Sequence, residues 1–291
     1  MINTLLEATA YNMRKWMRLK RLELSLSADI LPKTLTIIAN DLSKSYGTTL
    51  TFTGTEYTVK DLVNGDPIPI LKIFSPGSPA SADVGKYIIS IEGGEDDNYN
   101  FTYVSGTLTV IKSLLTATAD KKTKVYGSEN PVLSITYSGL VKNVDESVLN
   151  NAPVASTTAI NTSNVGIYAI TLSGGISKNY DLNLVNGSLE IVKAPLTITA
   201  EDKTKAYREV NPDLTIIYTG FVLGQDQGVL DVLPGAETDA TLDSDVGNYD
   251  INVYGADDSK YSFIYNKGNL NIIKADQAIT FEGIPKGLRM T

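Results

Sequence analysis

The stretch "LLTATADKKTKVYG", residues 114–127, joins an alternating run of apolar and small polar residues to a lysine-rich element that ends in Tyr-Gly. Alternation with a period of two predicts a β-strand over residues 114–119. Similar stretches, "TLTIIANDLSKSYG" and "PLTITAEDKTKAYR", occur at residues 34–47 and 195–208. The lysine-tyrosine element is therefore either a binding site present three times or a repeated part of a scaffold.

Landmark residues recur along the chain with a step of 80 or 81 positions. Several independent landmarks that keep one step indicate tandem modules of about 80 residues. The residues that keep the step are Tyr46, Tyr126 and Tyr207; Gly85, Gly166 and Gly247; Tyr87, Tyr168 and Tyr249; Tyr99, Tyr180 and Tyr261; Gly106, Gly187 and Gly268; and Lys112, Lys193 and Lys274.

The repeat divides the chain into five parts. Residues 33–113, 114–194 and 195–275 are predicted to be module 1, module 2 and module 3. Residues 1–32 form a non-repeat leader, either helical or disordered, and residues 276–291 resemble the truncated start of a further module. The connections between modules contain no Gly/Ser-rich linker, so we expect a stiff array rather than flexibly tethered domains.

Each module is predicted to be mostly β, with a sandwich-like or β-grasp-like fold and at most a short helix. After a Val-Gly turn, Tyr87, Ile89 and Ile91 alternate with other residues and are expected to share one face of a strand. Asn186-Gly187 lies between two alternating runs, which predicts a tight hairpin with positive φ at both turn residues.

Module 1 departs from the other two in its middle, where four prolines interrupt any continuous strand. The same fold with an altered middle connection is expected there. The prolines are Pro67, Pro69, Pro76 and Pro79.

The composition excludes several classes of function. The chain has no His and no Cys, which excludes imidazole bases, thiol nucleophiles, disulfides and zinc-thiolate sites. The net charge of -8 argues against a nucleic-acid partner, because phosphate contacts need clustered Lys and Arg. No run of 18 apolar residues predicts a membrane-spanning helix, and no motif predicts a cofactor.

Two sets of residues are candidate sites. The repeated tyrosines Tyr46, Tyr87 and Tyr99 are suited to stacking on carbohydrate, but their alternation favours a place in the core. The acidic loops at residues 92–100 and 255–261 carry oxygen ligands for Ca²⁺, yet module 2 lacks them, which favours solvated turns. No catalytic, cofactor-binding or metal-binding residue is predicted.

The pattern "LTATADKKTKVYG…NPVLSITYSGLV…NVGIYAITLSGG…KNYDLNLVNGSLEIVKA" resembles the MBG-type repeat of large bacterial surface proteins. The similarity covers about residues 33–275, and module 3 departs from it with Arg208 where Gly47 and Gly127 stand. The resemblance implies tandem mostly-β modules in an adhesin-like protein, either extracellular or at the cell surface. It supplies no catalytic residues.

The expected function is therefore a structural one: a non-enzymatic stalk region that acts as a stiff spacer in a bacterial cell-surface or secreted protein. The alternative is that the repeats themselves bind an extracellular glycan or protein through multivalent weak contacts. Within the repeat, the lysines of residues 120–127 are interpreted as a solvated edge, Tyr126 as a core residue and Gly127 as a turn.

Overall fold

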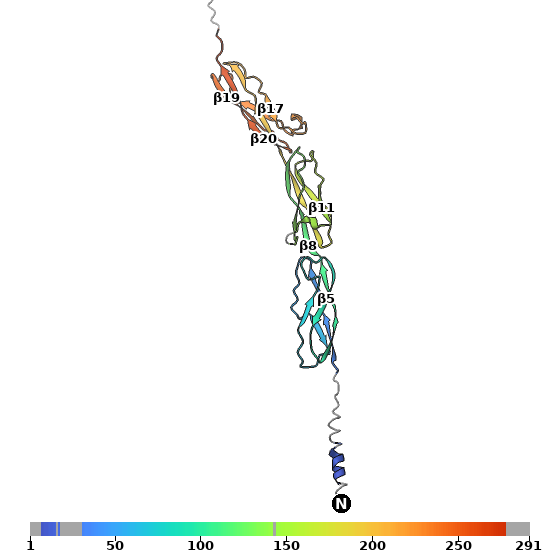
Figure 1. Cartoon of the computed structure of the whole chain (residues 1–291). Coiled ribbons are helices and arrows are strands. Elements are labelled where there is room, and N and C mark those ends of the chain that lie inside the picture. Colours follow the sequence, from blue (N-terminus) through green and yellow to red (C-terminus); the bar gives the residue numbers. More distant parts are fainter. Residues whose placement is uncertain (1–6, 16, 18–30, 142–143, 278–291) are drawn as a thin grey trace, which may run out of the picture. The chain divides into compact units, whose positions relative to one another are not determined.

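A computed structural model describes residues 7–15, 17, 31–141 and 144–277 (Figure 1). The chain divides into two compact units, residues 1–113 and residues 114–291. In the leader, residues 7–15 are helical and exposed. Most of the predicted start of a further module, from residue 278 on, lies outside the described residues. Among the residues that the structure describes, no helix is long and apolar enough to cross a membrane.

The first unit contains module 1, which is a sandwich of two sheets. The three-stranded sheet has the order β3-β1-β6 and the four-stranded sheet the order β2-β7-β5-β4. The strands are β1 (Lys33–Ala39), β2 (Leu42–Ser45), β3 (Tyr57–Lys60), β4 (Leu71–Phe74), β5 (Gly85–Gly93), β6 (Tyr99–Val104) and β7 (Gly106–Ile111). Of the two folds expected, the sandwich is the one observed.

The second unit contains modules 2 and 3, each with the same two sheets. Their orders are β10-β8-β13 and β11-β12-β14-β9 in module 2, and β17-β15-β20 and β16-β21-β19-β18 in module 3. The strands of module 2 are β8 (Ser113–Ala119), β9 (Lys122–Val125), β10 (Ile135–Ser138), β11 (Asn151–Thr157), β12 (Gly166–Ile176), β13 (Tyr180–Val185) and β14 (Gly187–Val192). Those of module 3 are β15 (Ala194–Ala200), β16 (Lys203–Ala206), β17 (Ile216–Thr219), β18 (Gly235–Thr238), β19 (Gly247–Tyr254), β20 (Tyr261–Asn266) and β21 (Gly268–Ile273).

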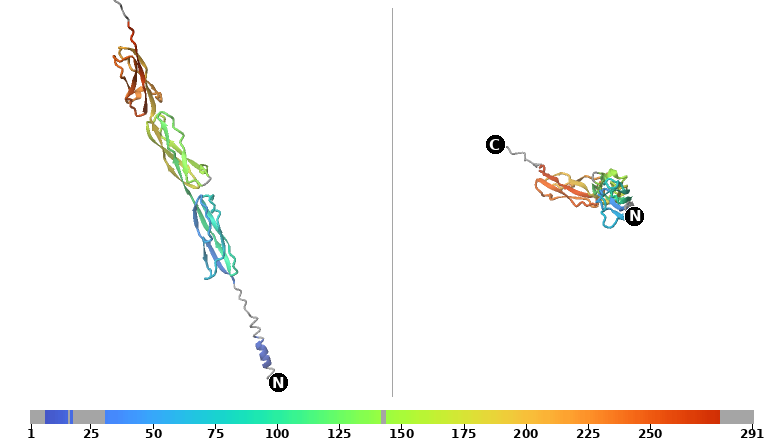
Figure 2. Two further views of the ribbon diagram at one scale, coloured as in Figure 1. Left: turned by 90° about the vertical axis from the view of Figure 1, so that its left-hand side faces the viewer. Right: turned by 60° about the horizontal axis from the view of Figure 1, so that its bottom comes forward.

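The core of each module lies between its two sheets, as the alternation predicts. In module 1, Leu35 and Ile37 on β1 are buried against Ile89 on β5 and Leu108 on β7. Burial of each such side chain contributes about 1.5–3 kcal/mol to folding. The views in Figure 2 show that the strands run roughly along the long axis of their own module.

The hairpin predicted at Asn186-Gly187 is wrong. β13 and β14, on either side of it, belong to opposite sheets, and neither residue has positive φ. The chain crosses there between the layers, and a Cβ on Gly187 would lie 2.3 Å from the carbonyl oxygen of Ala119. Glycine is required here by the close approach of two backbones, which produces the same Asn-Gly pattern as a tight turn.

The predicted departure in the middle of module 1 is confirmed. Modules 2 and 3 have a short 3₁₀ turn after their third strand, η1 (Glu146–Val148) and η2 (Gln227–Val229). The described part of module 1 has no such turn: residues 61–70 run from β3 to β4 without regular structure. Proline in this segment cannot donate to a strand ladder, in keeping with its irregular structure.

Candidate functional site

Each module buries one lysine of the lysine-tyrosine element. Lys44, Lys124 and Lys205 are only 8%, 6% and 4% exposed. They lie on β2, β9 and β16, which are edge strands of the four-stranded sheets. In β9 the burial pattern alternates, so that Lys124 faces inward while Thr123 faces solvent. The interpretation of these lysines as a solvated edge is therefore wrong for Lys124, and holds for the exposed Lys121.

The buried ammonium group joins two loops in every module. Lys124 Nζ donates to the carbonyl oxygens of Ser128 (3.0 Å) and Ile160 (2.8 Å). Lys205 Nζ donates in the same way to Glu209 (3.0 Å) and Thr241 (2.7 Å). The acceptors lie four and 36 positions further along the chain.

The same arrangement in module 1 joins Lys44 Nζ to the carbonyl oxygens of Thr48 and Pro79. Burial lowers the pKa of Lys44 and of Lys124, because the charged form is the one that loses water. Carbonyl acceptors compensate part of that loss. An inward-pointing charge on an edge strand also hinders pairing of that edge with another chain. The arrangement fits a structural clamp, which we call the lysine clamp.

The tyrosines that are candidates for stacking on carbohydrate are mostly buried or hydrogen-bonded within the fold. Tyr99, Tyr180 and Tyr261 are buried. The hydroxyl of Tyr87 donates to the carbonyl oxygen of Asp83 at 2.9 Å, and the equivalents in modules 2 and 3 make the same bond over four residues. A tyrosine that bonds back to the preceding loop fixes that corner of a β-sandwich.

The acidic loops that are candidate calcium sites use their carboxylates to cap turns. Asp96 Oδ1 accepts from the amide of Asn98 at 2.8 Å. Asp258 Oδ1 accepts from the amides of Lys260 (2.6 Å) and Tyr261 (3.0 Å). Among the described residues no group of three or more carboxylates is placed to hold a metal ion.

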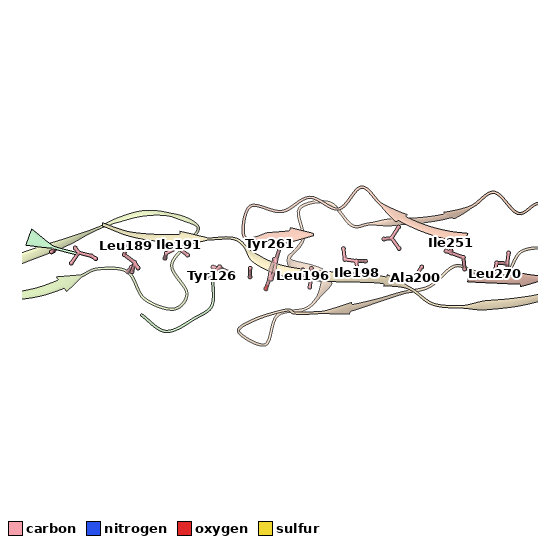
Figure 3. Packing of buried hydrophobic residues seen from close by; sticks show 14 of the residues in the cluster. Tyr126, Leu189, Ile191, Leu196, Ile198, Ala200, Ile251, Tyr261 and Leu270 are labelled. Atoms are coloured by element: carbon pink, nitrogen blue, oxygen red, sulfur yellow. The ribbon is translucent and has the colours of Figure 1, made fainter. Parts of the chain in front are cut away.

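Modules 2 and 3 share one continuous core. Figure 3 shows the buried row from Leu189 and Ile191 of module 2 to Leu196 and Ile198 of module 3, with Tyr126 and Tyr261 between them. The rings of Tyr126 and Tyr261 meet edge to face, with 6.0 Å between centroids and 82° between planes. This geometry is the favourable one for aromatic pairs. Sequence reasoning placed both tyrosines in the core but did not foresee that they meet across a module boundary.

Polar groups complete this junction. Gln225 Nε2 donates to the hydroxyl of Tyr126 (3.1 Å), and Gln225 Oε1 accepts from the hydroxyl of Tyr261 (2.6 Å). Lys193 Nζ, on the module 2 side, donates to the carbonyl oxygen of Asp258 (2.7 Å). Lys260 Nζ lies 5.7 Å from the centre of the Tyr126 ring, within cation–π range.

We call the module 2 side of this junction, with Tyr126, Gly127 and Lys193, the docking end. We call the module 3 side the base; it consists of Val222, Gln225, Asp258, Lys260 and Tyr261. The chain passes from the docking end to the base through Lys193, the single residue between β14 and β15.

One open cleft lies beside the base of module 3, with a volume of about 430 Å³. Aromatic and amide side chains line it, which is a mixture suited to a sugar or a peptide. Its lining residues are Tyr218, Phe221, Gln225, Asp226, Gln227 and Gly228. Two of these side chains already make hydrogen bonds within the fold: Gln225 bonds to Tyr126 across the junction, and Asp226 caps η2.

The family model for the MBG domain (YGX type) matches residues 35–109, 115–190 and 196–271. No curated protein matches the chain.

Similar solved structures include the three N-terminal domains of the bacteriophage RB49 Highly Immunogenic Outer Capsid protein, at 12% identity over 83% of this chain and 99% of that one, with a TM-score of 0.26. Drosophila N-cadherin EC1-3 is 8% identical over 82% and 99%, with a TM-score of 0.27. Domains 4–9 of the surface layer protein SbsC are 13% identical over 82% and 50%, with a TM-score of 0.19. At these TM-scores nothing known of those proteins carries over. The three tandem family matches cover most of the sequence, and the chain belongs to the MBG domain family, YGX type.

Proposed function

We propose that the chain is a non-enzymatic stalk region of a bacterial cell-surface or secreted adhesin-like protein, in which it acts as a stiff spacer. Its work is mechanical: it holds a neighbouring part of the protein at a distance. The continuous core between modules 2 and 3 is the observation that carries this proposal, because a shared core resists bending at a joint.

The connection between strands of successive modules supports the same function. In the second unit, β14 and β15 are separated by Lys193 alone. A one-residue connection leaves almost no chain length for free rotation. The family resemblance to bacterial surface proteins supports the proposed extracellular location. The absence of His, Cys and any recognisable catalytic motif from the sequence supports the proposed non-enzymatic role.

Stiffness is tested by distance measurements on spin-labelled protein. Because the chain has no native Cys, a pair such as Ile167→Cys and Ile264→Cys labels two exposed positions, one in module 2 and one in module 3. Pulsed electron paramagnetic resonance is expected to give one narrow distance distribution. A broad distribution, like that of flexibly linked domains, would contradict the spacer.

A second candidate function is direct binding of a glycan or a protein by the repeats. The cleft beside the base of module 3 favours it, since Tyr218 and Gln227 offer an aromatic face and an amide. A glycan array probed with the whole chain is the direct test. Saturable binding that is lost in Tyr218→Ala and Gln227→Ala variants, with unchanged circular dichroism, would favour binding over a pure spacer.

A further inference from the structure

We propose that Arg208 prevents another module of this family from docking on the C-terminal end of module 3. A contact like that between modules 2 and 3 does not form at this end. Arg208 occupies the position that Gly127 holds in the docking end of module 2. The inference concerns how modules dock and does not depend on where the protein is located or what it presents.

Gly127 is in contact with the base of module 3. A Cβ on Gly127 would lie 2.5 Å from Cγ2 and 2.7 Å from Cβ of Val222, distances so short that Val222 or its module would have to shift. Gly127 has φ 84° and Arg208 has φ 64°, so both residues share the left-handed backbone. The Cβ of Arg208 therefore points to the place that must be empty for docking.

The valine that requires this empty space is present in the base of every module. The amide of Val222 donates to the hydroxyl of Tyr261 at 3.2 Å. Val63 and Val141 make the same bond to the equivalent tyrosines of modules 1 and 2, both at 3.0 Å. A base like any of the three in this chain would thus bring a valine against Arg208.

Charge acts in the same direction as the steric clash. In the junction, Lys260 from the base lies over the ring of Tyr126. In module 3, the guanidinium of Arg208 lies 5.6 Å from the centre of the ring of Tyr207, the residue that corresponds to Tyr126. Arg208 supplies from within module 3 the cation that a docked neighbour supplies to module 2, and the lysine of a base like that of module 3 would meet a like charge.

A module joined after Lys274 would accordingly be connected to module 3 only through the polypeptide chain. It would lack a contact like that of Tyr126 with Gln225 and Tyr261. The joint after module 2, with glycine after the tyrosine, docks, whereas the end of module 3, with arginine at that position, stays open. Asp243 is 3.9 Å from Arg208, and both side chains are exposed, so this ion pair restrains Arg208 only weakly.

The first test transfers the arginine to the docking end. A Gly127→Arg variant of the full chain, with labels at Ile167→Cys and Ile264→Cys, is expected to give a distance distribution several-fold broader than the parent. Module 2 should still fold, since module 3 accommodates arginine at the same φ. Val132→Arg, at an 88% exposed position of the same loop, is the matched control and should leave the distribution narrow. An unchanged distribution in Gly127→Arg would overturn the proposal.

The second test adds a partner to the closed end. A copy of residues 194–274 is inserted between Lys274 and Ala275, either in the parent chain or with Arg208→Gly in the original module 3. Labels in module 3 and in the inserted copy should give a broad distribution in the parent and a narrow one with Arg208→Gly, and amide NMR spectra report that the copy is folded in both. Equal widths in the two proteins, whether broad or narrow, would show that Arg208 does not control docking.

Discussion

The ring of Tyr126 in module 2 meets the ring of Tyr261 in module 3 edge to face, and Gln225 bonds to both hydroxyl groups. Tyr126 is 99 residues before Gln225 in the chain, so the contact ties together two modules that are separate in sequence. Because of this contact the second unit has one hydrophobic core instead of two.

Truncation of Tyr126 should weaken the junction in two steps. Tyr126→Phe loses the bond from Gln225 and is expected to cost about 0.5–1.5 kcal/mol. Tyr126→Ala also loses the buried ring and is expected to cost about 3–5 kcal/mol. Urea unfolding of the full chain measures both, and Tyr254→Ala, at a half-exposed position, should change the free energy of unfolding by about 0.5 kcal/mol or less. Equal effects of the Phe and Ala variants would contradict the role of the ring.

Removal of the lysine clamp should destabilise its module. Lys124→Met keeps the apolar stem but leaves the carbonyls of Ser128 and Ile160 without their donor, at an expected cost of about 1–3 kcal/mol. Relief from burying the ammonium offsets part of this cost, so the lower half of the range is expected. Lys121→Met, at an exposed position, is the control in the same unfolding experiment. A Lys124→Met variant as stable as the parent would show that the clamp contributes nothing.

A methyl group at Gly187 should disrupt the crossing between the sheets of module 2. Gly187→Ala places a Cβ 2.3 Å from the carbonyl oxygen of Ala119, and overpacking of this kind costs about 1–3 kcal/mol. Gly224→Ala is the comparison, because its φ is 70° but no atom lies near its Cβ. That variant should lose only the backbone preference, about 1 kcal/mol. A smaller loss at Gly187 than at Gly224 would mean that the close approach is not what requires glycine.

Acid should destabilise module 1 through Glu56. Burial opposes ionisation of this carboxylate, but bonds from Thr53 and from the amides of its own turn outweigh it and lower the pKa of Glu56 to about 2. A depressed pKa means that the folded state holds the proton less tightly than the unfolded state. The stabilisation is therefore present above the unfolded value of about 4.5 and is lost as the pH falls toward about 2.

The measurement is the free energy of unfolding of the chain between pH 6 and pH 2. Glu56→Gln should be less stable than the parent at pH 6, and the difference should shrink as the pH falls. A difference that stays constant across this range would remove Glu56 as the titrating group. The amides of Thr53 and Gly54, which donate to Glu56 at 2.8 and 3.0 Å, give an NMR readout of the same titration.

The burial of the clamp lysine, though not its loop partners, could have been found from the sequence. Lys44, Lys124 and Lys205 keep the same step of 80 and 81 as the tyrosines, and each lies two positions before the tyrosine of its module. A charged residue that recurs in every repeat, at an inward position of an alternating strand, indicates a buried and bonded charge. Because lysine is usually a surface residue, its residue type favours a solvated edge, whereas its periodicity indicates burial.

The hairpin at Asn186-Gly187 shows the limit of local signals. Alternating runs on either side of Asn-Gly are the same whether the two strands pair with each other or enter opposite sheets. Here β14 pairs with β12, and β13 lies beside β8. The choice between the two arrangements depends on partners far along the chain.

The sequence by itself determined the number of modules, their mostly-β content and the residues that face the core, because a period of two and a period of about 80 are properties of the chain alone. Only the tertiary structure decided which strands share a sheet, that Lys124 is enclosed by two loops, and that Tyr126 meets Tyr261. Alternation specifies which side chains lie on one face of a strand, but contacts between strands and between modules depend on residues tens of positions apart, and no local pattern encodes that pairing.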